Sequence, residues 1–584
     1  MLWQDITEQR DGKEVRTVKS CAILRRPDGS FAFYDRVRPD AGPLELPDRD
    51  GGLHTLLPYL PTAIVRNDGI MESGILKNTQ VLQTGDCEIL SAFVRGEKLD
   101  REAVARVGLP RYLDVWTQQA SATMVAEPKM IWRGYNGSQI EYERMPDGRL
   151  LVPFGSFQPH ATPTPPHGRH KTVIQFSDDN GATWIESRSQ LLSPCYEGFN
   201  GLNEGACEPA FERMRDGRLW MLMRSQSGFL YESWSHDNGT TWQAAAASRF
   251  NTSTGPPCIL RHQDGRLVLC WNNCEMPPRA NGDGVYGGRD ALHIAISDDD
   301  GKHWRGFREI YLDHRRNDNP AKSGDRGTAY PLMAYTDDGQ ILVVAGQGRG
   351  GRNVILVDTE WITETRARSD FSNGLQDWSV YTHFGPAKRW WRAREVGCEL
   401  ITSPTDASGK CLRIRHQSHL PADGATWNFP NGWEATLNVR VMQQAGCQGG
   451  SIALTDRMFD PSNDYGEQFA VFRLDFDSAG KVGSQFLVPD RWHDISFHWN
   501  LSRGECQISI DGEPATTLSL LNPTLNGISY VRFRGALQQL DPAGFLVDHV
   551  DVTVHDRTSP PRTTDDQREH EQRYITSVVP TWQN

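Results

Sequence analysis

Three octapeptides in this chain follow one pattern, Ser-x-Asp-x-Gly-x-x-Trp. They are SDDNGATW at residues 177–184, SHDNGTTW at residues 235–242 and SDDDGKHW at residues 297–304. A repeat of this kind constrains the whole fold, because every copy is expected to form the same unit. Each copy predicts a β-hairpin turn in which the glycine takes a positive φ and the Asp and Ser side chains bond the turn backbone. The Trp is expected to pack beneath its own hairpin.

A second repeat places an Asp-Gly turn between two runs of strand-forming residues, which is a strong hairpin signal. The clear copies are Asp28-Gly29, Asp147-Gly148, Asp216-Gly217, Asp264-Gly265 and Asp338-Gly339, and a degenerate copy is Asp86-Cys87. Three of these hairpins are followed by an octapeptide, which gives two hairpins and four strands per unit, as in a propeller blade. We therefore predict an all-β fold with a six-bladed β-propeller over residues 1–366.

The remaining segments have a different character. Residues 98–110 predict a short helical insertion, with Asp100 as its N-cap and with Gly108 and Pro110 as stop signals. Alternating strands follow residue 370, and the segment RWHDISFHWNLSRGECQISIDGEPA resembles concanavalin-like jelly-roll modules. That resemblance implies a β-sandwich over residues 370–556. Residues 557–584 are polar and rich in proline, which predicts a tail or a strap on the surface.

Composition limits the classes of function. A chain of 584 residues is too long for one core, so at least two domains are expected. The net charge of −12 and the lack of a basic stripe argue against nucleic-acid binding, although local arginines can still bind an anionic small substrate. No apolar run is long enough for a transmembrane helix. No signal peptide is visible, so we expect a cytoplasmic protein, or a secreted or periplasmic one if a leader was removed. The 11 cysteines lack CxxC pairs and predict buried free thiols.

Strand length indicates which side chains share one end of each predicted blade. A strand of about seven to nine residues spans the blade height at about 3.3 Å per residue. The residue nine before each hairpin glycine and the residue seven after it should therefore lie at the same end, opposite the turn. The first set is Ser20, Asn78, Gln139, Glu208, Pro256 and Tyr330; the second set is Arg36, Val94 with Arg95 beside it, Gly155, Arg224, Asn272 and Gly346. Arginines, a carboxylate and a tyrosine at one end indicate a polar binding rim, and the small residues are expected to leave room for a ligand.

Several segments around these positions resemble the sialidase family, in which the octapeptides are called Asp boxes. EPAFERMRDGRLWMLMRSQSG resembles the segment that carries a glutamate and the second binding arginine, which places them at Glu208 and Arg224. AYPLMAYTDDGQILVV resembles the segment of the nucleophilic tyrosine, at Tyr330, and GGRDALHIAISDDDGKHW resembles that of the third arginine, at Arg289. In that family three arginines clamp a substrate carboxylate, and the tyrosine, activated by the glutamate, attacks the anomeric carbon.

The sequence also departs from that family. The segment LKNTQVLQTGDCEILSAFVRG has no arginine at the place of the family's first one, so Arg36 or Arg95 is the candidate for that role. Asp100 lies near the expected place of the acid/base aspartate, but inside the predicted helix. The loop GSFQPHATPTPPHGRHK offers His160, His167 and His170 instead, and a histidine there would serve as general acid or base near neutral pH.

The sequence therefore predicts an exo-acting glycoside hydrolase of the sialidase-like class that removes a terminal, acidic sugar from a glycan. In this hypothesis Tyr330 and Glu208 form the nucleophile pair; the candidate acid/base residues are Asp100, His167 and His170; the substrate-binding residues are Arg224, Arg289, Arg36, Arg95, Gln139 and Asn272. A histidine-dependent glycosidase or lyase acting on a uronic or neutral sugar is one alternative, and a non-catalytic carbohydrate-binding propeller is another. No metal, cofactor, nucleic acid or membrane partner is expected, because the chain has no metal-ligand spacing, phosphate-binding loop or basic stripe.

Overall fold

The computed structural model describes residues 89–560 apart from gaps, of which the longest are residues 121–126, 160–167, 194–203, 275–288 and 313–325. Before residue 89 it describes eight strands, and residues 561–584 lie outside it. The regular structure of the described chain is mostly β-strand, so the all-β prediction is confirmed. Three short helices accompany the strands in this part of the chain: α1 (Arg101–Val107), α2 (Thr359–Ile362) and α3 (Tyr465–Gln468).

The strands up to residue 357 form one set of sheets, in which neighbours in sequence are mostly neighbours in space. The first sheet contains β1 (Leu2–Arg10), β2 (Lys13–Arg25) and β3 (Phe31–Tyr34). The second sheet contains β6 (Val65–Arg66), β7 (Gly69–Ser73), β9 (Ile89–Lys98), β10 (Arg111–Ala120) and β11 (Lys129–Trp132). The third sheet contains β8 (Ile75–Leu76), β12 (Glu141–Arg144), β13 (Leu150–Pro159), β14 (Gly168–Ser177), β15 (Ile185–Glu186) and β16 (Glu204–Gly205). Strands β4 (Leu44–Pro47) and β5 (Leu53–Leu56) form a separate hairpin.

The next three sheets of this set are more regular. They contain β17 (Cys207–Arg213), β18 (Leu219–Arg224), β19 (Phe229–Ser235), β20 (Ala246–Asn251); then β21 (Cys258–Arg261), β22 (Leu267–Trp271), β23 (Ala291–Ser297), β24 (Arg305–Leu312); then β26 (Leu332–Tyr335), β27 (Ile341–Ala345) and β29 (Asn353–Val357). Strands β25 (Arg326–Gly327) and β28 (Gln347–Gly348) pair with each other in a separate two-stranded sheet. Antiparallel sheets of four strands in chain order fit the blade prediction, whereas closure into a six-bladed propeller stays a prediction.

The strands after residue 366 form two larger sheets around a core of their own. The larger sheet contains β30 (Arg366–Ser369), β34 (Glu399–Thr402), β35 (Lys410–His416), β37 (Glu434–Gln443), β42 (Trp492–Asn500), β43 (Glu505–Ile510), β44 (Glu513–Ser519) and β46 (Asp541–Asp556). The smaller sheet contains β31 (Trp378–Ser379), β36 (Gly424–Gly432), β38 (Gly449–Thr455), β39 (Phe472–Asp477) and β45 (Ile528–Gly535), and two hairpins are β32 (Tyr381–Lys388) with β33 (Trp391–Val396) and β40 (Lys481–Val482) with β41 (Gln485–Phe486).

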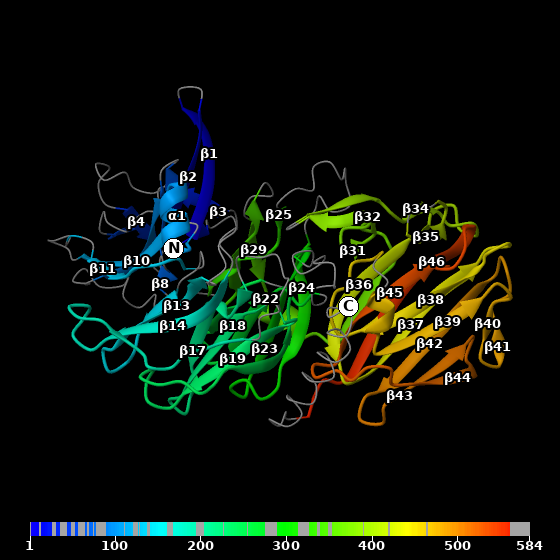
Figure 1. The fold of residues 1–584 in the computed structure, drawn as a ribbon. Coiled ribbons are helices and arrows are strands. Elements are labelled where there is room, and N and C mark those ends of the chain that lie inside the picture. Colours follow the sequence, from blue (N-terminus) through cyan, green and yellow to red (C-terminus); the bar gives the residue numbers. More distant parts are fainter. Residues whose placement is uncertain are drawn as a thin grey trace.

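Both sheets of this C-terminal region contribute to one apolar core, which contains Leu437 and Phe497 of the larger sheet and Trp427 and Phe533 of the smaller one. Buried residues alternate along β42, as expected for a strand with one face on a core. Figure 1 shows this region beside the N-terminal set of sheets. The jelly-roll topology and the predicted domain limits, residues 1–366, 370–556 and 557–584, stay predictions.

The three octapeptides adopt one geometry. In each, the Ser Oγ accepts the glycine N–H (2.8, 2.8 and 2.9 Å), the Asp Oδ1 accepts the N–H of the residue before Trp, and the Trp Nε1 donates to the glycine carbonyl. The glycines have φ values of 84°, 84° and 90°, as predicted. The Trp side chains at positions 242 and 304 are buried, so these boxes anchor their hairpins through both turn bonds and packing.

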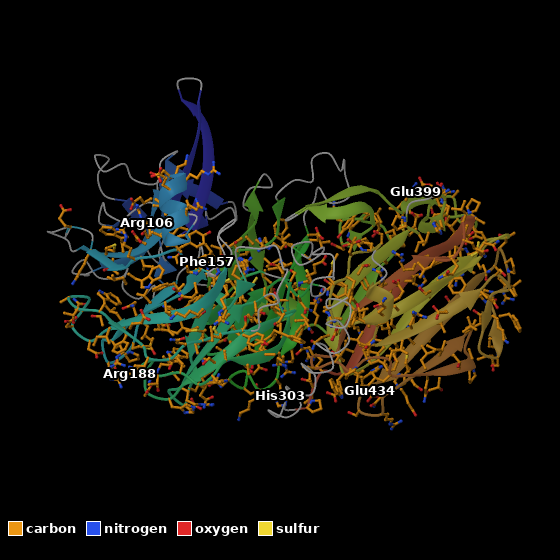
Figure 2. The ribbon with its side chains drawn as sticks, viewed as in Figure 1. Arg106, Phe157, Arg188, His303, Glu399 and Glu434 are labelled. Atoms are coloured by element: carbon orange, nitrogen blue, oxygen red, sulfur yellow. The ribbon has the colours of Figure 1, made fainter. Side chains whose placement is uncertain are left out.

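The boxes also join neighbouring sheets. In the second box Asn238 donates to Asp147 of the Asp-Gly hairpin in the preceding sheet, and Arg149 of that hairpin donates to the Asn238 carbonyl. In the third box Asp300 accepts the backbone N–H of Arg215. His303 of the third box lies at the lower edge of the molecule in Figure 2, below the labelled Phe157. The boxes therefore tie the turn ends of the sheets together.

Other predictions about this part of the chain have clear outcomes. Helix α1 begins after Asp100, whose side chain accepts the Ala103 N–H (2.7 Å), and ends at Gly108 with φ 71°, so the predicted caps are confirmed. The eight described cysteines are buried, and no disulfide joins any two of them. Among the described residues, no helix has the length and apolar character needed to cross a membrane. Within the same residues, no group of three or more His, Cys, Asp and Glu side chains is arranged to hold a metal.

Candidate functional site

A β-bulge interrupts the sheet that carries Glu208 and Arg224. Cys207 lies opposite Arg224 and Ala210 lies opposite Leu222, so Glu208 and Pro209 together face one partner residue. A ladder that continued regularly from the hairpin would pair Glu208 directly with Arg224, on one face. The bulge places Cys207 opposite Arg224 instead, and bulges are common near functional sites. Arg224 Nη1 then donates to Glu208 Oε2 at 2.5 Å, and both side chains are buried.

Tyr330 completes this group from a different sheet. It lies two residues before β26, and its hydroxyl is 3.3 Å from Arg224 Nη1 and 3.4 Å from Glu208 Oε1. Tyr330 is half-buried, whereas Arg224 is fully buried. The prediction that these three side chains share one end of their sheets therefore agrees with the structure, although nothing yet tests the roles assigned to them.

Two of the three residues have an unusual backbone. Glu208 has φ 46° and Tyr330 has φ 62°, a region that residues with a Cβ seldom occupy. Such conformations cost about 1–3 kcal/mol and are found preferentially where the surrounding structure holds a functional group in place. Tyr330 carries the phenol hydroxyl, and Glu208 lies within hydrogen-bond distance of it, so both strained residues position the same hydroxyl. This supports a functional interpretation of the cluster.

The charges in the cluster depend on one another. Burial would raise the pKa of Glu208, but the charges of Arg224 and Arg289 and the hydrogen bond from Arg224 hold this pKa below its ordinary value. Burial acts against the charge of Arg224, yet the Glu208 carboxylate keeps its pKa well above the ordinary value. Glu208 is therefore ionised at neutral pH. Its negative charge lies beside the buried Arg224 and Arg289.

Arg289 approaches Tyr330 from β23's N-terminal side. Its guanidinium carbon lies 5.4 Å from the centre of the Tyr330 ring, within cation–π range. The Arg289 carbonyl accepts the backbone N–H (2.8 Å) and the hydroxyl (3.2 Å) of Thr328. Asn272 is fully buried, and its Nδ2 donates to Ala291 O and Thr328 Oγ1. The contacts of Asn272 thus fix the segment before Tyr330. The substrate-binding role expected for Asn272 stays a prediction.

The space at Gly155 corrects one expectation. We expected this glycine to leave room for a ligand, but a Cβ placed on it would lie 2.8 Å from the Cys207 Cβ and 3.4 Å from the Glu208 nitrogen. The absence of a side chain lets β13 approach β17 at the bulge. Gly155 therefore supports the backbone of Glu208.

His170 also differs from its prediction. It lies in strand β14, fully buried between the rings of Tyr135 and Phe157 and not in a solvent-exposed loop. Burial lowers the pKa of His170 to about 3, with Glu208 opposing this shift and Arg224 adding to it. The imidazole is therefore neutral near pH 7 and is poorly suited to donate a proton there. The loop residues His160 and His167 lie outside the described residues.

The other predicted residues divide into three cases. Asp100 is exposed and caps α1, and its role as an acid/base residue stays a prediction. Arg36 and Gln139 lie outside the described residues. Arg95 lies in β9, but its side chain is not among those described, so the choice between Arg36 and Arg95 stays open.

Two residues of this neighbourhood escaped the sequence reasoning. Tyr135 is buried against His170 and Phe157, and the Arg111 guanidinium lies 6.0 Å from the centre of its ring. Burial raises the pKa of Tyr135; Arg111 opposes this shift, and nearby Glu208 and Tyr330 add to it. Tyr135 precedes β12, where the Asp147-Gly148 hairpin begins. Counting 13 residues back from that glycine, and not nine, would have found it, but no repeat signals that offset.

Comparison with known proteins agrees with this organisation. Residues 115–343 match the family model of the BNR repeat-like domain, and this segment contains all three octapeptides and Glu208, Arg224, Arg289 and Tyr330. No curated protein matches the chain in sequence.

Solved structures similar to this chain include sialidases at low identity. The Trypanosoma rangeli sialidase in complex with the inhibitor DANA has a TM-score of 0.35 and 11% identity, covering 96% of this chain and 88% of that one. The same enzyme in complex with sialic acid has a TM-score of 0.34 and 11% identity, covering 99% and 98%. A Dyadobacter fermentans protein of unknown function has a TM-score of 0.33 and 14% identity, covering 61% of this chain and 89% of its own.

Proposed function

We propose that this protein is a glycoside hydrolase of the sialidase-like class that removes a terminal acidic sugar, with Tyr330 as the nucleophile. The observation that carries the proposal is the position of the Tyr330 hydroxyl, 3.4 Å from Glu208 Oε1 and 3.3 Å from Arg224 Nη1. A nucleophile beside a group able to accept its proton, which is itself held by a third group, is the usual arrangement of covalent catalysis.

Each residue has a distinct task in this mechanism. The ionised Glu208 accepts the proton of the Tyr330 hydroxyl as the phenol oxygen attacks the anomeric carbon, while the glycosidic C–O bond breaks and the leaving alcohol takes a proton from water. Water then attacks the anomeric carbon and releases the sugar, and Glu208 returns the proton to the phenol oxygen. Arg224 holds Glu208 in place and keeps it ionised, because its Nη1 donates to both partners. A phenol suits a sugar whose anomeric carbon bears a carboxylate, since a carboxylate nucleophile would be repelled by that charge.

Two arginines in the cluster suit an acidic ligand. Arg224 donates to the Tyr330 hydroxyl and Arg289 lies over the Tyr330 ring, and guanidinium groups bind carboxylates well. Among the described residues, Nε and Nη2 of Arg224 have no hydrogen-bond partner, and this edge of a guanidinium matches a carboxylate bidentately. Because Arg224 is fully buried, a ligand contacts these atoms only after neighbouring groups move.

The histidine-dependent alternative gains no support from His170, because its pKa of about 3 leaves a weak base and, at neutral pH, no acid. One experiment separates the candidate functions. Aryl glycosides of sialic, uronic and neutral sugars should be incubated with the wild type, Tyr330→Phe and the control Tyr335→Phe. Tyr335 is an exposed tyrosine on β26.

We expect an acidic aryl glycoside to be cleaved, with kcat lowered by at least about 100-fold in Tyr330→Phe and unchanged in Tyr335→Phe. Equal rates for the wild type and Tyr330→Phe would show that Tyr330 is not the nucleophile. Binding of an acidic sugar without cleavage of any glycoside would instead make the chain a carbohydrate-binding protein.

A further inference from the structure

We propose that the C-terminal region is part of the candidate site, and that Tyr381 is a positioning residue that holds Arg289 through Asp290. This inference rests on the proposed function, because it assigns a role to Arg289 in binding the acidic substrate. The two regions of the chain would then act together, with the C-terminal sheets setting the geometry of a site whose reacting groups all belong to the N-terminal sheets.

The central contact is a buried hydrogen bond between the two regions. The Tyr381 hydroxyl donates to Asp290 Oδ2 at 2.9 Å, and both side chains are buried. The Tyr381 ring packs in an apolar cluster with residues of both regions, among them Ala291 and Tyr530. The hydroxyl is thus fixed by packing, and a charge-assisted bond at this distance restrains the backbone of Asp290.

Because Asp290 directly follows Arg289 in the chain, a restraint on the backbone of Asp290 also restrains the backbone of Arg289 at the site. The Arg289 carbonyl accepts two hydrogen bonds from Thr328, which is two residues before Tyr330. A Cβ on Gly327 would lie 2.8 Å from the same carbonyl, so the two segments are in close contact. The Arg289 guanidinium in turn lies over the Tyr330 ring. A shift of Asp290 would therefore move the ligand-binding arginine and the segment that carries the nucleophile.

The C-terminal region also contacts the chain after β22, through Asn273. Asn273, directly after Asn272, donates through Nδ2 to Asp456 O at 3.1 Å, and its own carbonyl accepts the Met458 N–H at 3.0 Å. The Asn273 N–H donates to His293 Nδ1, which places the proton of the neutral imidazole on Nε2. That Nε2 donates to the Tyr530 hydroxyl, which donates to Glu309 Oε2. Contacts to the C-terminal region thus hold residues that precede and follow Arg289 in the chain.

The test compares two variants that each remove hydrogen bonds between the regions. Tyr381→Phe deletes one hydroxyl and keeps the ring in its cluster. Asn431→Ala is the control: the Asn431 side chain bonds the Gly306 N–H and the Trp304 carbonyl, beside the third octapeptide at the turn end of its sheet. Kinetics are measured with the acidic aryl glycoside that the wild type cleaves, alongside Tyr330→Phe. Crystal structures of the wild type and Tyr381→Phe give a readout that does not need turnover.

We expect KM to rise about tenfold or more in Tyr381→Phe, with a smaller change in kcat, and neither to change in Asn431→Ala. In the crystal of Tyr381→Phe we expect the Arg289 guanidinium to leave its place over the Tyr330 ring. An unchanged KM, or an unmoved Arg289, would overturn this inference while leaving the proposed function intact if Tyr330→Phe is inactive. An active Tyr330→Phe would overturn the proposed function, and the position of Arg289 in the crystals would still decide whether Tyr381 positions it.

Discussion

At the scale of single residues, the buried pair of Glu208 and Arg224 carries both the chemistry and a large stability effect. Removing one partner of a buried ion pair leaves an uncompensated charge, which costs about 3–5 kcal/mol. Glu208→Gln should therefore lower the free energy of unfolding by about that amount at neutral pH. The same substitution removes the group whose ionised form accepts the Tyr330 proton, so turnover should fall as well.

The pH dependence of this effect follows from the lowered pKa of Glu208. Because its pKa is lower in the folded than in the unfolded protein, the stabilising contribution is complete above the ordinary value of 4.5 and is lost as the pH falls through the folded value. Urea unfolding of the wild type and Glu208→Gln between pH 3 and pH 8 measures this difference. We expect it to be constant above about pH 6 and to shrink in acid. A difference that grows in acid would contradict the assignment of the charge.

At the scale of elements, the second Asp box packs its turn on the neighbouring sheet. Gly239 has φ 84°, and a Cβ there would lie 2.7 Å from Leu151 Cδ2. Gly148 has a similar φ of 92°, but a Cβ there would have no other atom within 4 Å, so Gly148→Ala tests backbone strain alone. We expect urea unfolding to show a loss of about 1 kcal/mol for Gly148→Ala and at least about 1 kcal/mol more for Gly239→Ala. Equal losses would show that the box does not pack on Leu151.

The elements also show what sequence alone predicts. The box turns and the Asp-Gly hairpins were predictable, because glycine conformation and side-chain bonds to the turn are local. Counting along paired strands placed Glu208 and Arg224 at the same end of their sheet, since register continues from the hairpin up to the bulge. The bulge at Glu208 and the burial of His170 were not predictable, because β13 and β14 meet β16 and β17 from far away in the sequence.

At the scale of the whole molecule, polar contacts join the two regions at several separate places. Arg249 donates to Asn526 Oδ1, to the Leu525 carbonyl and to Ser559 Oγ, and Tyr381 donates to Asp290. The sequence indicated two regions from their change in pattern but not this interface. Its polar groups are spread over segments with no shared motif. Of these contacts, the bond from Tyr381 to Asp290 carries the proposed support for the site.

The central claim is that the Tyr330 oxygen forms the bond to the sugar, and covalent trapping tests it most directly. A fluorinated acidic sugar with a good leaving group slows breakdown of the glycosyl-enzyme, and peptide mass spectrometry then locates the modified residue. We predict a single adduct on the peptide that contains Tyr330, absent from Tyr330→Phe. An adduct on any other side chain, or an equal adduct in Tyr330→Phe, would contradict the account.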